Sequence, residues 1–421
     1  MRLNRDLSGI KNRKTDTDAA VETSVRDILT DVRHGGDHAV MKYAELFDGF
    51  KGENLLVSDE EIKSAMLAAS PDFLELLKRA RSQIEEFHLN QVEKSWSVYK
   101  DSGVMMGQIA RPLKRVALYV PGGTAFYPSS VLMNAIPARM AGVKELAIFT
   151  PVKGDGLVSD IIIAAAVTCG VNTIYKIGGA HGIAAAAYGT QSIPKFDKIV
   201  GPGNAYVATA KRMVYGEVDI DMIAGPSEVL IIADHTANPK YIAADLMSQA
   251  EHDVMSSAIL ITTCETLINE TENEIERQIS GLSRASIIRE SLKNYGAAIL
   301  THDLYDAFEI SNDLAPEHLE ILTENPLEKL SLVQNAGSIF LGEHTPEPLG
   351  DYMSGTNHVL PTGGSAKFYS PLGVYDFVKF SSYSYYPQDA LEQLKDDVIK
   401  FASLEGLDAH ANSIKVRFSD D

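Results

Sequence analysis

The residues of this chain that could do chemistry gather between positions 198 and 253. Two glycine–proline turns, GPGN (201–204) and AGPSE (224–228), bracket one predicted helix, and a second predicted helix ends near Gln249 and His252. These two residues are three positions apart, so a helix would place them on one face. An amide and an imidazole on one face can both donate to a single metal ion.

Two further residues could complete such a metal site. Asp351 lies in LGDYMSGTNHVLPT and His410 lies in EGLDAHANS. Two imidazoles, a carboxylate and an amide oxygen suit zinc or another borderline divalent ion. The HExxH motif of common zinc peptidases is absent. On spacing alone, His252 is better explained as a helix histidine that is satisfied within the protein, because distant ligands cannot be recruited without a fold.

A second candidate is the adjacent pair Glu317 and His318 in LAPEHLEIL. We interpret this stretch as the start of a helix, where neighbouring side chains diverge by about 100° and would serve different atoms. A carboxylate and an imidazole offer two separate proton acceptors, with ordinary pKa values of about 4 and 6.5. The simpler alternative is a solvated helix start, with Glu317 stabilised by the positive end of the helix dipole.

Three glycine-containing turns could bind a phosphate. They are YVPGG (119–123), IGGAHG (177–182) and GPGNAY (201–206), and each accompanies a predicted strand. Backbone amides at such turns can bind phosphate, and Tyr119 could cover a ring. No turn matches G-x-G-x-x-G, so a plain tight turn is the alternative to nucleotide binding.

The elements that would position these residues alternate between strands and helices. Short buried strands are predicted at 115–121, 145–150, 172–179, 198–203, 227–234, 256–264, 295–303 and 336–342, with helices between them. This alternation is typical of parallel, doubly wound sheets, and two α/β units in tandem are the simplest interpretation. Apolar stripes predict packing helices at 19–36 and 70–89.

Composition excludes several classes of function. The formal net charge of −19 leaves no basic surface for nucleic acid or an anionic membrane. Cys169 and Cys264 are the only cysteines and lie far apart, which excludes a disulfide framework and a thiolate zinc site. The N-terminal residues lack the apolar core of a signal peptide, and the apolar run at 161–171 is too short to span a bilayer. We expect a soluble, cytoplasmic protein with two or more packing units.

Longer motifs resemble those of a known family. The runs GPGNAYVATAKR, IDMIAGPSEVLIIAD, DLMSQAEHD, APEHLE, GDYMSGTNHVLPT and EGLDAHANS, in this order over roughly residues 20 to 415, are similar to the histidinol dehydrogenase family. The resemblance implies four-electron oxidation of L-histidinol through L-histidinaldehyde to L-histidine, the last step of histidine biosynthesis. It also implies two NAD, one zinc per subunit and a homodimer with shared active sites.

The resemblance assigns roles to individual residues. It implies zinc ligands at Gln249, His252, Asp351 and His410, further substrate contacts at Ser227, His318 and Glu405, and cofactor contacts at Tyr119, His181 and Asn204. His318 would accept the alcohol proton, and Glu317 would activate the water that hydrates the aldehyde. The family commonly has GGAQ where this chain has GGAH, so His181 replaces a glutamine. An imidazole keeps one polar contact but not an amide's adjacent donor and acceptor, which affects NAD binding first.

The resemblance also implies a fold class, an aldehyde-dehydrogenase-like α/β architecture with two incomplete Rossmann-type units. We therefore expect residues 1–114 to form a mostly helical segment that packs on the second α/β unit. Residues 115–226 would form the first Rossmann-like unit on the NAD side, and 227–372 the second α/β unit on the zinc and substrate side. Residues 373–421 would form a helical tail, with a helix over 389–407, that is swapped to the partner subunit.

Other functions stay open on the residues alone. A related zinc and NAD dehydrogenase could oxidise another small polar alcohol. A zinc hydrolase could use Glu317 as its base, and it would turn over without nicotinamide. A binding protein that retained the fold would have no need of both bases and all the ligands.

Overall fold

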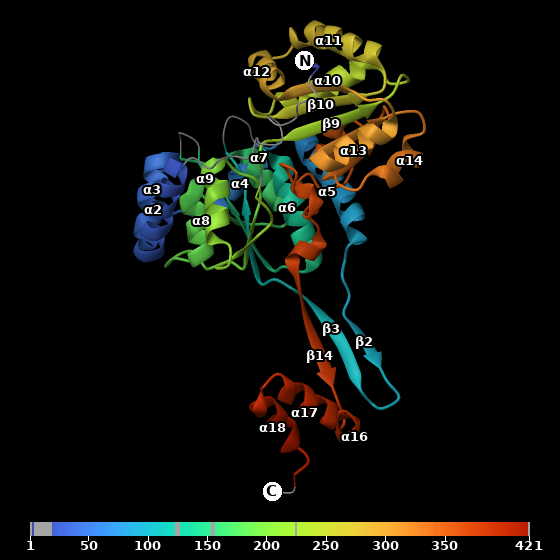
Figure 1. The fold of residues 1–421 in the computed structure, drawn as a ribbon. Helices are drawn as coiled ribbons and strands as arrows, with labels where there is room; N and C mark the ends of the chain where they lie inside the picture. Colours follow the sequence, from blue (N-terminus) through green and yellow to red (C-terminus); the bar gives the residue numbers. More distant parts are fainter. Residues whose placement is uncertain (1, 4–18, 123–126, 153–155, 224, 420–421) are drawn as a thin grey trace. The chain divides into compact units, whose positions relative to one another are not determined.

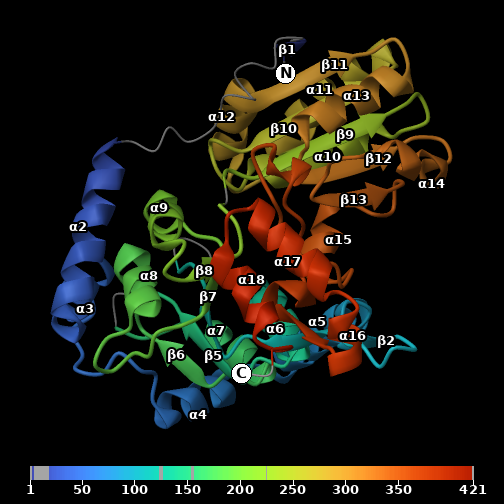
Figure 2. The ribbon, with the colours of Figure 1, turned by 60° about the horizontal axis from the view of Figure 1, so that its bottom comes forward.

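The computed structural model describes residues 2–3, 19–122, 127–152, 156–223 and 225–419. The chain divides into two compact units. The main unit comprises residues 1–91 and 113–377, and the small unit comprises residues 92–112 and 378–421. Figures 1 and 2 show the ribbon in two orientations.

The main unit contains two parallel sheets, as the strand–helix alternation predicted. The first sheet has the order β6-β5-β4-β7-β8, and all its pairs are parallel. Its strands are β4 (Arg115–Tyr119), β5 (Glu145–Phe149), β6 (Thr173–Tyr175), β7 (Lys198–Val200) and β8 (Asp219–Ile220). The connecting helices are α6 (Pro128–Ala141), α7 (Asp160–Thr168), α8 (Gly179–Tyr188) and α9 (Ala205–Val214).

The second sheet has the order β1-β11-β10-β9-β12-β13 and is also parallel. Its strands are β1 (Arg2–Leu3), β9 (Glu228–Ala233), β10 (Ser257–Thr262), β11 (Gly296–Leu300), β12 (His318–Leu322) and β13 (Ser338–Leu341). Its helices are α10 (Pro239–Ala250), α11 (Glu265–Ile279), α12 (Ala285–Tyr295), α13 (Leu304–Leu314), α14 (Pro326–Lys329) and α15 (Glu347–Tyr352). Short 3₁₀ turns follow at Leu330–Leu332, Ser365–Lys367 and Val374–Phe377.

Alternate residues along the strands of the second sheet belong to two separate apolar clusters. Val229 and Ile231 of β9 pack with α10, α11 and α12, whereas Leu230 and Ile232 pack with α13 on the other face. Figure 1 shows these helices on the two sides of the sheet. Burial on both faces explains why the strands are nearly continuous apolar runs.

Although strand β1 of the N-terminal segment pairs with β11 of the second sheet, the four N-terminal helices pack mainly on helices of the first sheet and not on the second α/β unit as expected. They are α2 (Ala19–Gly35), α3 (Asp37–Asp48), α4 (Asp59–Ala68) and α5 (Pro71–Leu89). α2 contacts α8 and α9, α4 contacts α7, and α5 contacts α6. The reason lies in α8, whose residues 180–187 are all buried. A helix that is buried all round needs a second covering layer, which α2 and α3 supply.

The small unit differs from the expected helical tail. It contains an antiparallel sheet of order β14-β3-β2, with β2 (Trp96–Tyr99), β3 (Met105–Pro112) and β14 (Val378–Tyr385). The helix expected over 389–407 is divided into α16 (Gln388–Glu392) and α17 (Lys395–Leu404), and α18 (Asp408–Lys415) follows. Among the helices of the described residues, none combines the length and apolar character that a bilayer crossing requires.

Candidate active site

Glu317 and His318 lie at the start of strand β12, so the interpretation as a helix start was wrong. Strand β12 is an interior strand that pairs with β9 and β13. Burial follows from that position, and the side chains of Glu317 and His318 are 9% and 6% exposed. A solvated helix start is therefore excluded for this pair.

The backbone of one residue, Glu228, holds both side chains. Its N–H donates to Oε2 of Glu317 at 2.9 Å, and its carbonyl oxygen lies 2.8 Å from Nδ1 of His318. A carbonyl only accepts, so Nδ1 carries the proton and Nε2 has the free lone pair. Glu228 and His318 are the first residues of β9 and β12, which places this pair at the amino ends of the strands.

Burial shifts the proton affinities of the two groups in opposite directions. It lowers the pKa of His318 to about 4, against smaller effects of Asp351 and the Glu228 carbonyl. It raises the pKa of Glu317 well above its ordinary value, against the hydrogen bond from Glu228. Desolvation disfavours the charged form of each group. His318 is thus a neutral imidazole that can accept a proton at Nε2, and Glu317 is a more basic carboxylate than a solvated one.

Two carboxylates of helix α15 lie near the imidazole of His318. Oε1 of Glu347 lies 3.6 Å from Nε2, and ligand atoms of His318, Glu347 and Asp351 lie within 4.8 Å of one another. Burial raises the pKa of Glu347 to about 8. Burial also raises the pKa of Asp351, but a hydrogen bond from His358 and the nearby histidines bring it below its ordinary value. One imidazole and two carboxylates are a donor set that a divalent cation accepts.

Glu347 and His358 were not predicted as site residues from the sequence. Nδ1 of His358 lies 3.4 Å from Oδ1 of Asp351, and its Nε2 lies 3.4 Å from the hydroxyl of Ser130. A signal existed for Glu347, since it precedes Asp351 by four residues on a helix and shares its face. Nothing in the sequence pairs His358 with Asp351.

The proposed zinc ligands on α10 fit a metal. Helix α10 ends at Ala250, and His252 lies in the turn beyond it rather than in the helix as expected. Gln249 is 1% exposed, and its Oε1 has no hydrogen-bond partner among the described residues. His252 is near enough to contribute to the lowered pKa of Asp351. A buried amide oxygen without a donor, an ionised carboxylate and an imidazole suit a borderline divalent ion.

Ser227, Glu405 and His410 have different surroundings. Ser227 immediately precedes Glu228, and its carbonyl accepts the N–H of Ser257 at 3.0 Å. Glu405 caps the C-terminal end of α17, and His410 lies on α18, where both are exposed. These last two residues belong to the small unit.

The cofactor candidates follow strands of the first sheet. Tyr119 ends β4, and its buried hydroxyl accepts the N–H of Gly179 at 3.1 Å. Burial raises the pKa of Tyr119 to about 12. Asn204 caps α9, its side chain accepting the N–H groups of Tyr206 and Val207 at 3.1 Å each. The order of the strands changes direction between β4 and β7, since β5 and β6 lie on one side of this pair and β8 lies on the other. Ligands of doubly wound sheets bind at such a point.

A buried ion pair fixes the turn between β7 and α9. Lys211 pairs with Asp221 and donates to the carbonyl of Gly201 at 2.9 Å, while Asp221 accepts the Gly201 N–H at 2.7 Å. Gly201 has φ of 111°, and a Cβ there would lie 2.1 Å from the Tyr119 carbonyl oxygen. Only glycine fits this close approach.

His181 is fully buried in the first turn of α8. Its Nε2 lies 3.2 Å from Oδ2 of Asp48, which also accepts the Gly178 N–H at 2.9 Å. Nδ1 has no partner among the residues that the structure describes. His181 therefore has an intramolecular partner in α3, and one ring nitrogen remains for a further contact.

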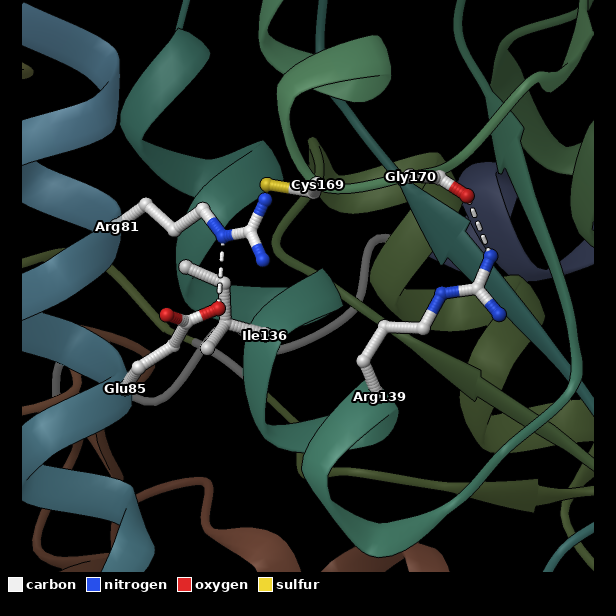
Figure 3. A pocket seen from close by; sticks show the side chains of 6 residues that line it. All are labelled: Arg81, Glu85, Ile136, Arg139, Cys169 and Gly170. Carbon is white, nitrogen blue, oxygen red and sulfur yellow. Dashed lines mark hydrogen bonds and ion pairs between the residues drawn. The ribbon is translucent and has the colours of Figure 1, made fainter.

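A cavity of about 370 Å³ lies beside α5, α6 and α7, away from these residues (Figure 3). Its two arginines are already engaged. Arg81 donates to Glu85 and to the carbonyl of Thr168, and Arg139 donates to the carbonyl of Gly170. Burial raises the pKa of Cys169 to about 12, so its thiol is not a nucleophile at neutral pH. This cavity has no group that is set up for catalysis.

Comparisons with known proteins agree over nearly the whole chain. A family model described as histidinol dehydrogenase matches residues 11–418. Histidinol dehydrogenase from Lactococcus lactis is 60% identical over 412 residues, covering 97% of this chain and 96% of the relative. The enzyme from Clostridium acetobutylicum is 54% identical, covering 98% and 96%. The crystal structure of histidinol dehydrogenase from Elizabethkingia anophelis matches with a TM-score of 0.90 at 37% identity, covering 99% of this chain and 93% of that one.

Proposed function

The chain belongs to the histidinol dehydrogenase family of NAD-dependent oxidoreductases, and from that premise we propose how its residues carry out the reaction. The chain oxidises L-histidinol through L-histidinaldehyde to L-histidine, with two NAD and one zinc per subunit. The observation that carries this assignment is the pair Glu317 and His318. Both are buried and are held by one backbone residue, and His318 lies beside Asp351.

The two bases divide the proton transfers. Nε2 of His318 takes the proton of the alcohol hydroxyl. At the same time, the carbon that bears this hydroxyl transfers a hydride to the nicotinamide. Glu317 then takes a proton from water as the water oxygen adds to the aldehyde carbon. His318 returns its proton to the aldehyde oxygen in the same step, which gives a neutral hydrate and leaves Nε2 of His318 free again. The hydrate loses a second hydride to a second NAD, and its remaining hydroxyl proton goes to His318. Proton transfer by positioned groups of this kind is general base catalysis.

The remaining site residues bind and orient the substrate. Zinc would be held by Gln249, His252, Asp351 and His410, and it would supply Lewis-acid anchoring of the substrate's imidazole and amine nitrogens. Ser227 and Glu405 contact the substrate, and Glu405 holds the amino group. Support comes from the buried Oε1 of Gln249, which needs a partner that the described residues do not supply.

NAD would bind at the carboxyl ends of β4 and β7, with contacts from Tyr119, His181 and Asn204. The turn after β7 is held in place, because Lys211 and Asp221 form hydrogen bonds with the backbone of Gly201. For a ligand that must present a reactive ring at a defined distance, a prearranged turn lowers the ordering cost of binding.

The His181→Gln variant tests the placement of the cofactor. Glutamine restores the residue that is common in the family, so the KM for NAD is expected to change while the KM for histidinol stays nearly the same. Steady-state kinetics with each substrate varied in turn measures both constants. A change confined to histidinol would show that this turn lies outside the cofactor site.

We propose that the small unit serves a partner subunit and that the enzyme is a homodimer. The unit exposes many apolar side chains for its size, among them Trp96, Tyr99, Val398, Phe401 and Leu404. The last three recur along α17 at helical spacing. Exposed apolar stripes of this kind are typical of protein–protein contacts. Glu405 and His410 would then enter the site of the neighbouring chain.

Subunit mixing tests the shared site. His318→Asn and His410→Asn are each expected to be inactive, and exchange of their subunits should produce about half mixed dimers. In a mixed dimer one site has both lesions and the other has none, so about a quarter of all sites should recover. If His410 served its own chain, every site would keep one lesion. Absence of recovered activity after verified exchange would therefore reject the shared site.

The test of the proposed function is NADH formation by the purified protein from L-histidinol and NAD. A zinc hydrolase that used Glu317 as its base would turn over its substrate without nicotinamide. A dehydrogenase of another small polar alcohol would form NADH but would prefer that alcohol to histidinol. Absence of NADH with L-histidinol would reject the assignment.

A further inference from the structure

Two acidic residues, Glu320 and Asp245, lie on the elements that carry the proposed zinc and proton-transfer residues. Glu320 follows His318 by two residues on β12 and is 0% exposed. Its Oε1 accepts the backbone N–H of Glu347, the first residue of α15, at 2.8 Å. This hydrogen bond ties the beginning of α15 to the middle of β12.

The side chain of Glu320 also has a neighbour on helix α10. Oε2 is buried and receives no hydrogen bond from an N–H or hydroxyl group of the described residues. The carboxyl group of Asp245 is the hydrogen-bonding neighbour of the Glu320 carboxyl group as a whole. Burial and the charge of Asp245 raise the pKa of Glu320 well above its ordinary value, and burial raises that of Asp245 to about 6. The raised pKa favours the protonated form of Glu320, in which its O–H can donate to the Asp245 carboxyl group.

Glu320, Asp245 and Glu347 each lie on the same face of their helix or strand as a residue of the site. Asp245 precedes Gln249 by four positions on α10, and Glu347 precedes Asp351 by four on α15. Residues at this spacing lie one helical turn apart. His318 and Glu320 point to the same face of β12, because side chains on a strand alternate. Helix α10 covers this face, which Leu322 shares with Leu246 and Met247 in one apolar cluster.

We propose that Glu320, together with Asp245, is a positioning residue that fixes α10, β12 and α15 relative to one another and so sets the distances among Gln249, His318 and Asp351. This inference rests on the proposed zinc ligands. Groups that orient metal ligands in this way typically change metal affinity by about 10- to 100-fold when they are removed.

A pair of variants at position 320 separates hydrogen bonding from packing. In Glu320→Gln, the amide oxygen can accept the Glu347 N–H and the amide N–H can donate to Asp245, so both bonds are retained. In Glu320→Met, the side chain keeps a similar length but loses both bonds. Competition with a chelator, using zinc alone as the probe, should give wild-type affinity for Glu320→Gln. It should give affinity at least about tenfold weaker for Glu320→Met.

Three further variants guard against loss of folding. Asp245→Leu removes only the α10 side of the pair, at a partly exposed position, and should weaken zinc several-fold, whereas Asp245→Asn should not. Ile275→Ala, in the same apolar cluster on α11, destabilises the fold through a cavity and should leave zinc affinity unchanged.

The outcomes separate this inference from the proposed function. A wild-type protein that binds no zinc overturns the zinc assignment and this inference with it. A wild-type protein that binds zinc, with unchanged affinity in folded Glu320→Met and Asp245→Leu, overturns this inference alone. Equal losses in Glu320→Gln and Glu320→Met would also overturn it, because the hydrogen bonds would then not matter.

Discussion

The His318→Asn variant is expected to lose about a hundredfold or more of its rate of histidinol oxidation, since it lacks the base that takes the alcohol proton. The carbonyl of Glu228 fixes the tautomer of His318, which leaves Nε2 as the acceptor. An asparagine amide has no comparable basic atom. Rates of NADH formation from histidinol and from histidinaldehyde should be measured separately for each variant.

Glu317→Gln should damage the aldehyde step more than the alcohol step. The glutamine side chain can still accept the Glu228 N–H but cannot take a proton from water. Glu290→Gln, an exposed change of the same type on α12, is the matched control and should behave as wild type. If both site variants slowed both steps equally, the division of labour between the bases would be wrong.

Removal of zinc is expected to abolish histidinol oxidation and to leave the fold intact. Zinc is proposed to anchor the substrate, so without it the alcohol carbon is no longer held beside Nε2 of His318. The fold should persist, because three apolar clusters hold the main unit together without any metal contact. Structural zinc domains, which unfold when the metal is removed, lack such cores.

The metal prediction needs two readouts on the same sample. Circular dichroism should be unchanged after chelation, and addition of zinc should restore the rate. Full activity in a preparation shown to be free of metal would reject the zinc assignment. Unfolding on chelation would mean that the metal is structural.

The elements of the two parallel sheets could be predicted because their signals are local. The runs at 115–121 and 227–234 are apolar, short and bounded by turns, which is enough to indicate buried strands. The strands of the small unit could not be predicted in this way. Strand β3 pairs with β14 across more than half the chain, and most of its residues are not fully buried.

The site was predicted only in part, for physical reasons. The motifs identified Glu317 and His318, but these residues were assigned to a helix because a proline precedes them. A short stretch of sequence does not reveal that β9 lies beside them. Glu228 acts on both side chains through its backbone N–H and carbonyl, and such backbone contacts cannot be recognised from the residue type. Glu320 looks like an ordinary strand residue until Asp245 and Glu347 are brought next to it.

The stoichiometry of NADH formation from L-histidinol tests the central claim most directly. Two bases that serve two successive oxidations predict two NADH for each L-histidinol consumed, with L-histidine as the product and no accumulation of histidinaldehyde. One NADH per substrate with release of the aldehyde, or product formation without NADH, would contradict the proposed roles of Glu317 and His318.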